Sequence, residues 1–99
     1  MPFIMTTVNT RATPTIEFQI LPESLVQHIQ TQYRDTGKIL DLQTAFSSNL
    51  LTRTTVITFR DVAALSQYKL DTILNDAFNS IRTYNAANGI SHQRTVVNE

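Results

Sequence analysis

The sequence predicts one α+β domain whose elements follow one another as β-α-β-β-α-β. Two observations lead to this order. Runs rich in alternating apolar or β-branched residues, which are typical of strands, lie on either side of two longer stretches with helical spacing. Each of these stretches ends beside one of the chain's two glycines, the residue that most often terminates a helix. The length of 99 residues is that of a single domain.

The N-terminal part of the chain is predicted to contain an arm followed by the first strand. Residues 1–13 show no regular period, so we expect an N-terminal arm there and place the domain at residues 14–99. In residues 15–20, apolar and polar side chains alternate strictly, which indicates a half-buried strand. Its buried face would carry Ile16, Phe18 and Ile20.

The first helix is predicted over residues 22–36. Pro22 suits the first turn of a helix, where a missing N–H leaves no hydrogen bond unmade. Ile29 and Tyr33 belong to a set of apolar residues at helical spacing. Gly37 follows as a C-cap, so the helix should end just before it.

Two strands that lie close together in the sequence are predicted to form a hairpin. Residues 40–46 place Leu42 and Phe46 on one face, and residues 53–59 are dense in β-branched side chains. Between them, residues 47–49 form a cluster of turn-favouring residues. Strands separated by so short a turn normally pair with each other.

The stretch from residue 62 to residue 88 contains no glycine or proline and is predicted to form a broken helix. Its apolar residues fall into two sets that point in different directions, so one straight helix could not bury both. We expect a short helix over residues 62–68 that Asp61 caps, a kink, and a longer helix that Asp71 caps. The pair Asn88-Gly89 should end the longer helix.

The last strand is predicted over residues 90–97, and neither of its faces is clearly apolar, which suits a sheet edge or pairing with another chain. The complete order is that of the split βαβ, ferredoxin-like plan, in which two helices cover one face of a four-stranded antiparallel sheet. The opposite face of the sheet is expected to be polar, rich in threonine and nearly uncharged. Such a face favours a wet interface or a shallow polar cavity over a freely solvated surface.

Composition excludes several classes of function. Eight basic and eight acidic residues give zero net charge, so no overall field attracts nucleic acid or anionic lipid. The absence of cysteine excludes disulfides, thiolate metal sites and thiol nucleophiles. No apolar run approaches the roughly 18 residues of a membrane span, and the N-terminus lacks the features of a signal peptide. We therefore expect a cytoplasmic protein with no cofactor, nucleic-acid partner or membrane contact.

Few residues are candidates for chemistry. The histidines His28 and His92 are the candidate catalytic groups, although helix-edge and strand-edge positions like theirs are more often structural. No metal-ligand spacing, glycine-rich phosphate loop or glycine-flanked serine nucleophile is present, so no metal site is expected. Tyr33, Arg60 and Tyr68 are the candidate ligand-binding residues. Together with His28 they are expected to line a cavity between the sheet and the helices.

Residues 54–88 run from a strand that ends in Arg60-Asp61 through a short helix and a turn to a longer helix. In this order they resemble the dimeric α+β barrel superfamily, which includes the antibiotic-biosynthesis monooxygenase-like proteins. The resemblance implies a homodimer in which two sheets pack face to face into a barrel. Haem-degrading members use a tryptophan that this chain lacks. The composition, poor in lysine and free of cysteine, is also similar to that of small proteins of tailed bacteriophages, especially cyanophages.

Three functions follow from these observations. The first is a homodimeric interaction or accessory protein without catalysis of its own, because no catalytic set is recognisable. The alternative, which the resemblance implies, is a small-molecule-binding or cofactor-free monooxygenase-like enzyme. RNA binding is disfavoured, because the strand over residues 53–59 has one aromatic residue and no glycine where an RNA-recognition motif needs a basic-glycine-aromatic pattern.

Overall fold

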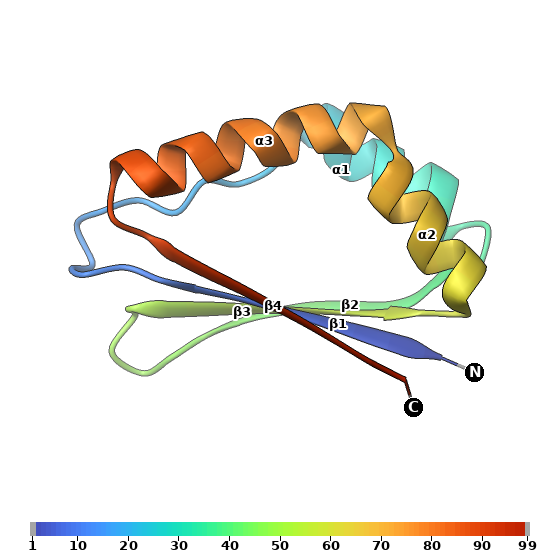
Figure 1. Ribbon diagram of the computed structural model, residues 1–99, viewed down its shortest axis with the longest axis horizontal. Coiled ribbons are helices and arrows are strands. Elements are labelled where there is room, and N and C mark those ends of the chain that lie inside the picture. Colours follow the sequence, from blue (N-terminus) through green and yellow to red (C-terminus); the bar gives the residue numbers. More distant parts are fainter. Residues whose placement is uncertain (1, 99) are drawn as a thin grey trace.

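The computed structural model describes residues 2–98 and has two layers, a four-stranded antiparallel sheet and a layer of helices on one of its faces (Figure 1). The strand order β2-β3-β1-β4 confirms the predicted ferredoxin-like α+β fold. Along the chain the elements are β1 (Phe3–Thr10), α1 (Glu23–Ile29), the π-helical turn η1 (Gln30–Arg34), β2 (Ile39–Phe46), β3 (Thr52–Phe59), α2 (Val62–Leu70), α3 (Thr72–Ala87) and β4 (Ser91–Asn98).

The first strand lies earlier in the chain than predicted. β1 pairs with β3 on one side and with β4 on the other, so the segment expected to be an arm forms a central strand. Residues 15–20 form no strand but belong to the connection between β1 and α1, where Ile20 is 79% exposed. The predictions of an arm and of a strand at residues 15–20 are therefore wrong. Because β1 carries apolar and threonine side chains on both faces, it lacks the alternation that marks a half-buried strand.

The break in the second helical stretch lies where it was predicted. Between α2 and α3, the Asp71 carboxylate accepts hydrogen bonds from the amides of Ile73 and Leu74 at 3.0 and 3.2 Å. Asp61 caps α2 in the same way, by accepting from the amide of Ala64 at 2.9 Å. Both predicted caps are confirmed, and the break divides the predicted second helix into two. No helix within residues 2–98 combines the length and the apolar character that crossing a bilayer requires.

The first helix and the strands that follow it agree broadly with prediction. α1 continues into the turn η1, and Gly37, with a φ of 79°, leads the chain out of the helix and into β2. β2 and β3 form the predicted hairpin. β4 pairs with β1 at the edge of the sheet, as expected for a strand without a clearly apolar face.

The hydrophobic core occupies one end of the space between the two layers. Tyr33, Phe59 and Leu74 are fully buried there. Tyr68 packs edge-on against Phe59 and Tyr33, with ring centroids at 5.2 and 5.3 Å. From this end, α3 extends over the other half of the sheet (Figure 1). The core therefore anchors α3 at its N-terminal end, and the other half of the sheet can carry different side chains.

Candidate ligand-binding site

The helix-facing side of the sheet changes from apolar to polar along its strands. Near α2 it carries buried aromatic and aliphatic side chains, which belong to the core. Towards the opposite end these give way to threonine, asparagine, arginine and histidine, and the short threonine side chains leave space below the helices. In order from α2, the rows of paired residues are Ile39, Phe59, Phe3 and Asn98; Leu42, Ile57, Met5 and Val96; Thr44, Thr55, Thr7 and Arg94; and Phe46, Arg53, Asn9 and His92.

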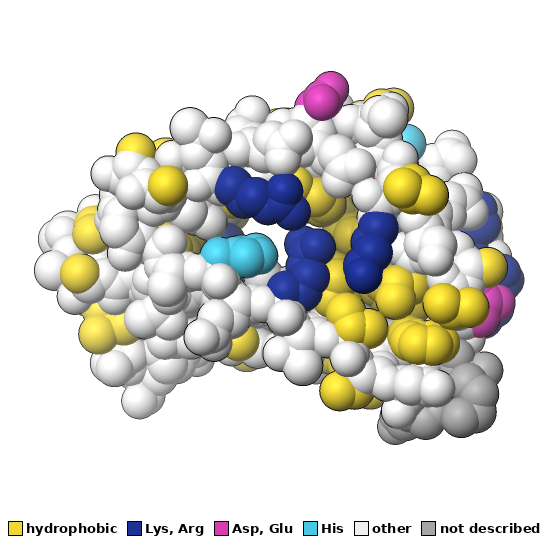
Figure 2. Space-filling model, viewed as in Figure 1, with side chains coloured by type: hydrophobic (Ala, Val, Ile, Leu, Met, Phe, Trp, Pro, Cys, Tyr) yellow, Lys and Arg dark blue, Asp and Glu magenta, His cyan; other side chains and the backbone are white. Residues whose placement is uncertain are grey.

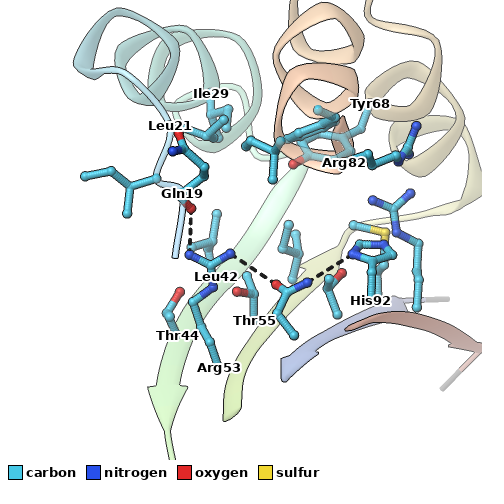
Figure 3. Close-up of a pocket in the computed structure, with 18 of the residues that line it drawn as sticks. Gln19, Leu21, Ile29, Leu42, Thr44, Arg53, Thr55, Tyr68, Arg82 and His92 are labelled. Carbon is cyan, nitrogen blue, oxygen red and sulfur yellow. Dashed lines mark hydrogen bonds between the residues drawn. The ribbon is translucent and has the colours of Figure 1, made fainter. Parts of the chain in front are cut away.

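A hollow of about 440 Å³ lies between this half of the sheet and the helix layer (Figure 3). α1 contributes Ile29 to its lining, and α3 contributes Phe78 and Ile81. The connection between β1 and α1 adds Gln19 and Leu21 at its side. The hollow therefore has a largely apolar roof above a floor that becomes polar with distance from the core.

A chain of hydrogen bonds holds the polar end of the floor in place (Figure 3). Asn9, which is 4% exposed, accepts through Oδ1 a hydrogen bond from Nη2 of Arg53 at 3.1 Å. Its Nδ2 donates to Nδ1 of His92 at 3.1 Å, so the ring proton of a neutral His92 lies on Nε2. Arg53 Nη1 donates to the carbonyl of Gln19 at 2.7 Å, which ties the connection to the sheet.

The connection between β1 and α1 is fixed beside the hollow by arginine contacts. The ring of Phe18 lies 4.3 Å from the guanidinium carbon of Arg11 and 4.8 Å from that of Arg53, a cation–π arrangement. Arg11 also donates to the carbonyls of Ile16 and Leu50 at 2.7 and 2.8 Å. Of the alternating residues that predicted a strand, Gln19 and Ile20 line the hollow instead.

Arg82 from α3 and Arg94 from β4 add positive charge to the lining of the hollow. Burial lowers the pKa of Arg94, and the charge of Arg82 lowers it further. Burial, and then the charges of Arg94 and Arg82, also lower the pKa of His92, which is therefore neutral at pH 7. Figure 2 shows basic and histidine side chains gathered around a hollow on this face, with the Asp and Glu side chains lying away from it.

The structure brings two of the predicted site residues to the hollow. His92 and Tyr68 line it, and burial raises the pKa of Tyr68 to about 12. His28, Tyr33 and Arg60 do not line it. Arg60 instead forms an exposed ion pair with the neighbouring aspartate at 3.2 Å. The predicted cavity therefore exists, but most of the residues expected around it lie elsewhere.

His28 and Tyr33 converge on Asp71, at the break between α2 and α3. Nε2 of His28 and the hydroxyl of Tyr33 each donate to Oδ2 of Asp71 at 2.8 Å. Burial alone would raise the pKa of Asp71, but these hydrogen bonds and that from the amide of Leu74 outweigh it and lower the pKa. The cluster holds the helix layer together. Within residues 2–98, no group of three or more His, Asp or Glu side chains is placed to hold a metal ion.

Sequence reasoning does not place Asn9, Arg53, Arg82 and Arg94 at the hollow, although all four line it. The three arginines are scattered along the chain. The strand register brings Arg53 and Arg94 to the hollow, and the packing of α3 over the sheet adds Arg82. The available signal is the density of β-branched residues in residues 3–10, the same signal that identifies β3. A strand placed there puts Asn9 between Arg53 and His92, its two hydrogen-bond partners.

Two solved structures share this fold at low sequence identity. One is a dimeric ferredoxin-like protein from an uncultured marine organism, with a TM-score of 0.57, 10% identity, and an alignment that covers 99% of this chain and 96% of that one. The other is Rv0793 from Mycobacterium tuberculosis, with a TM-score of 0.56, 13% identity, and coverage of 98% of this chain and 94% of that one. No protein-family model and no curated protein matches the chain significantly. These similarities establish the ferredoxin-like α+β fold.

Proposed function

We propose that this protein is a homodimer that binds a small molecule in the hollow between its sheet and α3. The hollow itself carries the proposal. Its volume of about 440 Å³ falls within the range of roughly 300–1,000 Å³ that is usual for ligand pockets. An apolar lining with a few converging polar groups is also the usual composition of such a pocket.

The polar groups of the hollow support this function because they are held in position by the protein itself. Asn9 joins Arg53 and His92 through hydrogen bonds at 3.1 Å on both sides. The same arginine is fixed by the Gln19 carbonyl. Groups that are already ordered lose little entropy when a ligand arrives, which favours binding.

The far face of the sheet, which points away from the helices, supports the homodimer. It carries the residues that alternate with the helix-facing rows, among them Thr6, Val8 and Val56. Within residues 2–98, Asp41 is its only charged side chain. A face of threonine and β-branched apolar residues suits a second copy of the same face better than it suits water. One structural neighbour is itself described as dimeric.

A reaction on the bound molecule is the second candidate function. The monooxygenase-like resemblance implies oxidation without a cofactor. His92 favours this reading, because the Nε2–H of its neutral ring can donate a hydrogen bond to negative charge that develops on a bound substrate. Oxygen uptake in the presence of a bound ligand distinguishes catalysis from binding alone.

Filling the hollow tests the binding function. Thr55 belongs to the floor of the hollow, so the ring introduced by Thr55→Phe should occupy part of it. The wild-type protein should bind 2-naphthamide, an uncharged bicyclic probe, with a dissociation constant on the order of 100 μM. In isothermal titration calorimetry, Thr55→Phe should weaken this binding by about 10-fold or more.

The matched control is Thr83→Phe, which adds the same ring to an exposed position of α3. This variant should bind the probe as the wild type does, and circular dichroism should show that both variants are folded. Equal binding by Thr55→Phe and the wild type would mean that the probe lies elsewhere. Absence of binding to the wild type would count against the hollow as a ligand site.

A further inference from the structure

The charge around the hollow is strongly unbalanced, although the whole chain has equal numbers of basic and acidic residues. Arg53, Arg82 and Arg94 all line the hollow, and no aspartate or glutamate does. The side-chain ion pairs found within residues 2–98 are His28 with Asp71 and Arg60 with its neighbour, and neither includes an arginine of the hollow. The positive charge there therefore lacks a protein counter-charge among the described residues.

The three arginines differ in how far the protein already uses their donors. Arg53 donates to Asn9 and to the Gln19 carbonyl, so it serves mainly to build the floor. Arg82 donates from Nη1 to the side chain of Asn79 at 3.0 Å, and its other N–H groups are left for a ligand. No hydrogen bond from the Arg94 guanidinium to residues 2–98 is formed. Nε of Arg53 has no partner among the described residues but is buried, so Arg82 and Arg94 are the arginines with accessible donors left for a ligand.

Arg82 and Arg94 reach the hollow from opposite layers, since one lies on α3 and the other on β4. Both line the same hollow, and the nearby charge of Arg82 lowers the pKa of Arg94. An anion bound between two guanidinium groups is attracted to both of them and so offsets their mutual repulsion. His92 lies in the same lining, and its Nε2–H supplies a neutral donor beside them.

The rest of the lining is apolar and would contact the body of the ligand. Ile57 and Leu42 belong to the floor nearer the core, and Phe78 and Ile81 lie on α3 above it. Burial of apolar surface against these side chains would add affinity without dependence on charge. A ligand that satisfies both regions has an apolar body and one negatively charged end.

We infer that the hollow selects apolar carboxylic acids, whose carboxylate lies between Arg82 and Arg94 and whose body lies against Ile57, Phe78 and Ile81. This inference rests on the proposed binding function and names the class of its ligand. A carboxylate fits because the planar guanidinium of arginine pairs with it through two parallel hydrogen bonds. The hollow has no lysine and no glycine-rich loop in its lining, which are the groups that commonly hold phosphate.

The experiment compares two probes of the same shape. Isothermal titration calorimetry at low ionic strength is carried out with 2-naphthoate, which carries a carboxylate, and with 2-naphthamide, which is uncharged. The wild-type protein should bind 2-naphthoate about 10-fold more tightly. Arg94→Gln and Arg82→Gln should each lower the affinity for 2-naphthoate by about 10-fold. The affinity for 2-naphthamide should change by less than about 2-fold.

The control is Arg34→Gln, which removes the same charge from an exposed position outside the hollow and should leave both affinities unchanged. Equal affinity of the two probes for the wild type would overturn the inference and leave the binding function intact. Failure of both probes to bind would overturn the binding function itself. Tighter binding of 2-naphthyl phosphate than of 2-naphthoate, by about 10-fold, would reject carboxylates as the ligand class.

Discussion

Asp71→Ala is expected to lower the free energy of unfolding by about 4 kcal/mol. The carboxylate caps α3 and also accepts hydrogen bonds from His28 and Tyr33. Loss of a cap costs about 1 kcal/mol, and a hydrogen bond to a charged acceptor is worth roughly 1.5 kcal/mol or more. The side chain is only 13% exposed, so water replaces these partners incompletely. Urea denaturation followed by circular dichroism measures the difference.

Two further variants separate the contributions of Asp71. Asp61→Ala removes the cap of α2, and in the described part of the chain the Asp61 carboxylate accepts no hydrogen bond from a buried tyrosine or histidine. This variant should therefore lower the free energy of unfolding clearly less than Asp71→Ala does. Asp71→Asn keeps an oxygen that can cap α3 but loses the charge. If Asp71→Ala costs no more than Asp61→Ala, the cluster of His28, Tyr33 and Asp71 does not stabilise the helix layer as described.

The stabilisation by Asp71 should depend on pH in a defined direction. Its pKa is lowered in the folded protein, because the hydrogen bonds that it accepts favour the charged form despite its burial. The contribution is therefore complete above the unfolded-state pKa of about 3.9 and is lost as the pH falls through the lower folded-state pKa. The stability difference between the wild type and Asp71→Asn should shrink as the pH drops below about 4.

Val56→Lys is expected to weaken the homodimer by roughly 100-fold or more. Val56 lies on β3, one of the two central strands, and its side chain is on the far face of the sheet. In an interface between two copies of this face, the lysine would be buried twice without a partner, and an unpaired buried charge costs several kcal/mol. Sedimentation equilibrium over the micromolar range measures the change.

The matched control is Leu70→Lys, which introduces the same charge at the end of α2, where the leucine is 76% exposed. It should leave the dimer unchanged, since α2 lies on the opposite side of the sheet from the far face (Figure 1). A dimer that persists in Val56→Lys would place the interface elsewhere. A wild-type protein that sediments as a monomer at micromolar concentration would contradict the homodimer.

The elements that could be predicted are those whose signals are local. The break between α2 and α3 follows from two sets of apolar residues with different directions and from Asp71, whose capping role needs only its next neighbours. The hairpin of β2 and β3 likewise depends on strands joined by a short turn. Such features are decided within a few residues of the chain and are visible without its tertiary structure.

β1 and the hollow could not be predicted in the same way, because both depend on distant parts of the chain. β1 carries apolar and threonine side chains on both of its faces, so its sequence shows no simple alternation. The contact between Asn9 and His92 joins residues 83 positions apart. His92 and Tyr68 could be named as candidates from their types alone, whereas the convergence of Arg82 and Arg94 required the register of β4 and the packing of α3 over the sheet.

The most direct test of the ligand site uses nuclear Overhauser effects between 2-naphthoate and the methyl groups of the protein. Ile57 and Val56 are neighbours in β3, but their side chains lie on opposite faces of the sheet. If the ligand occupies the hollow, its ring protons should show contacts to the methyl groups of Ile57 and Ile81 and none to those of Val56 and Val8. Contacts to Val56 and Val8 without contacts to Ile57 and Ile81 would contradict the account.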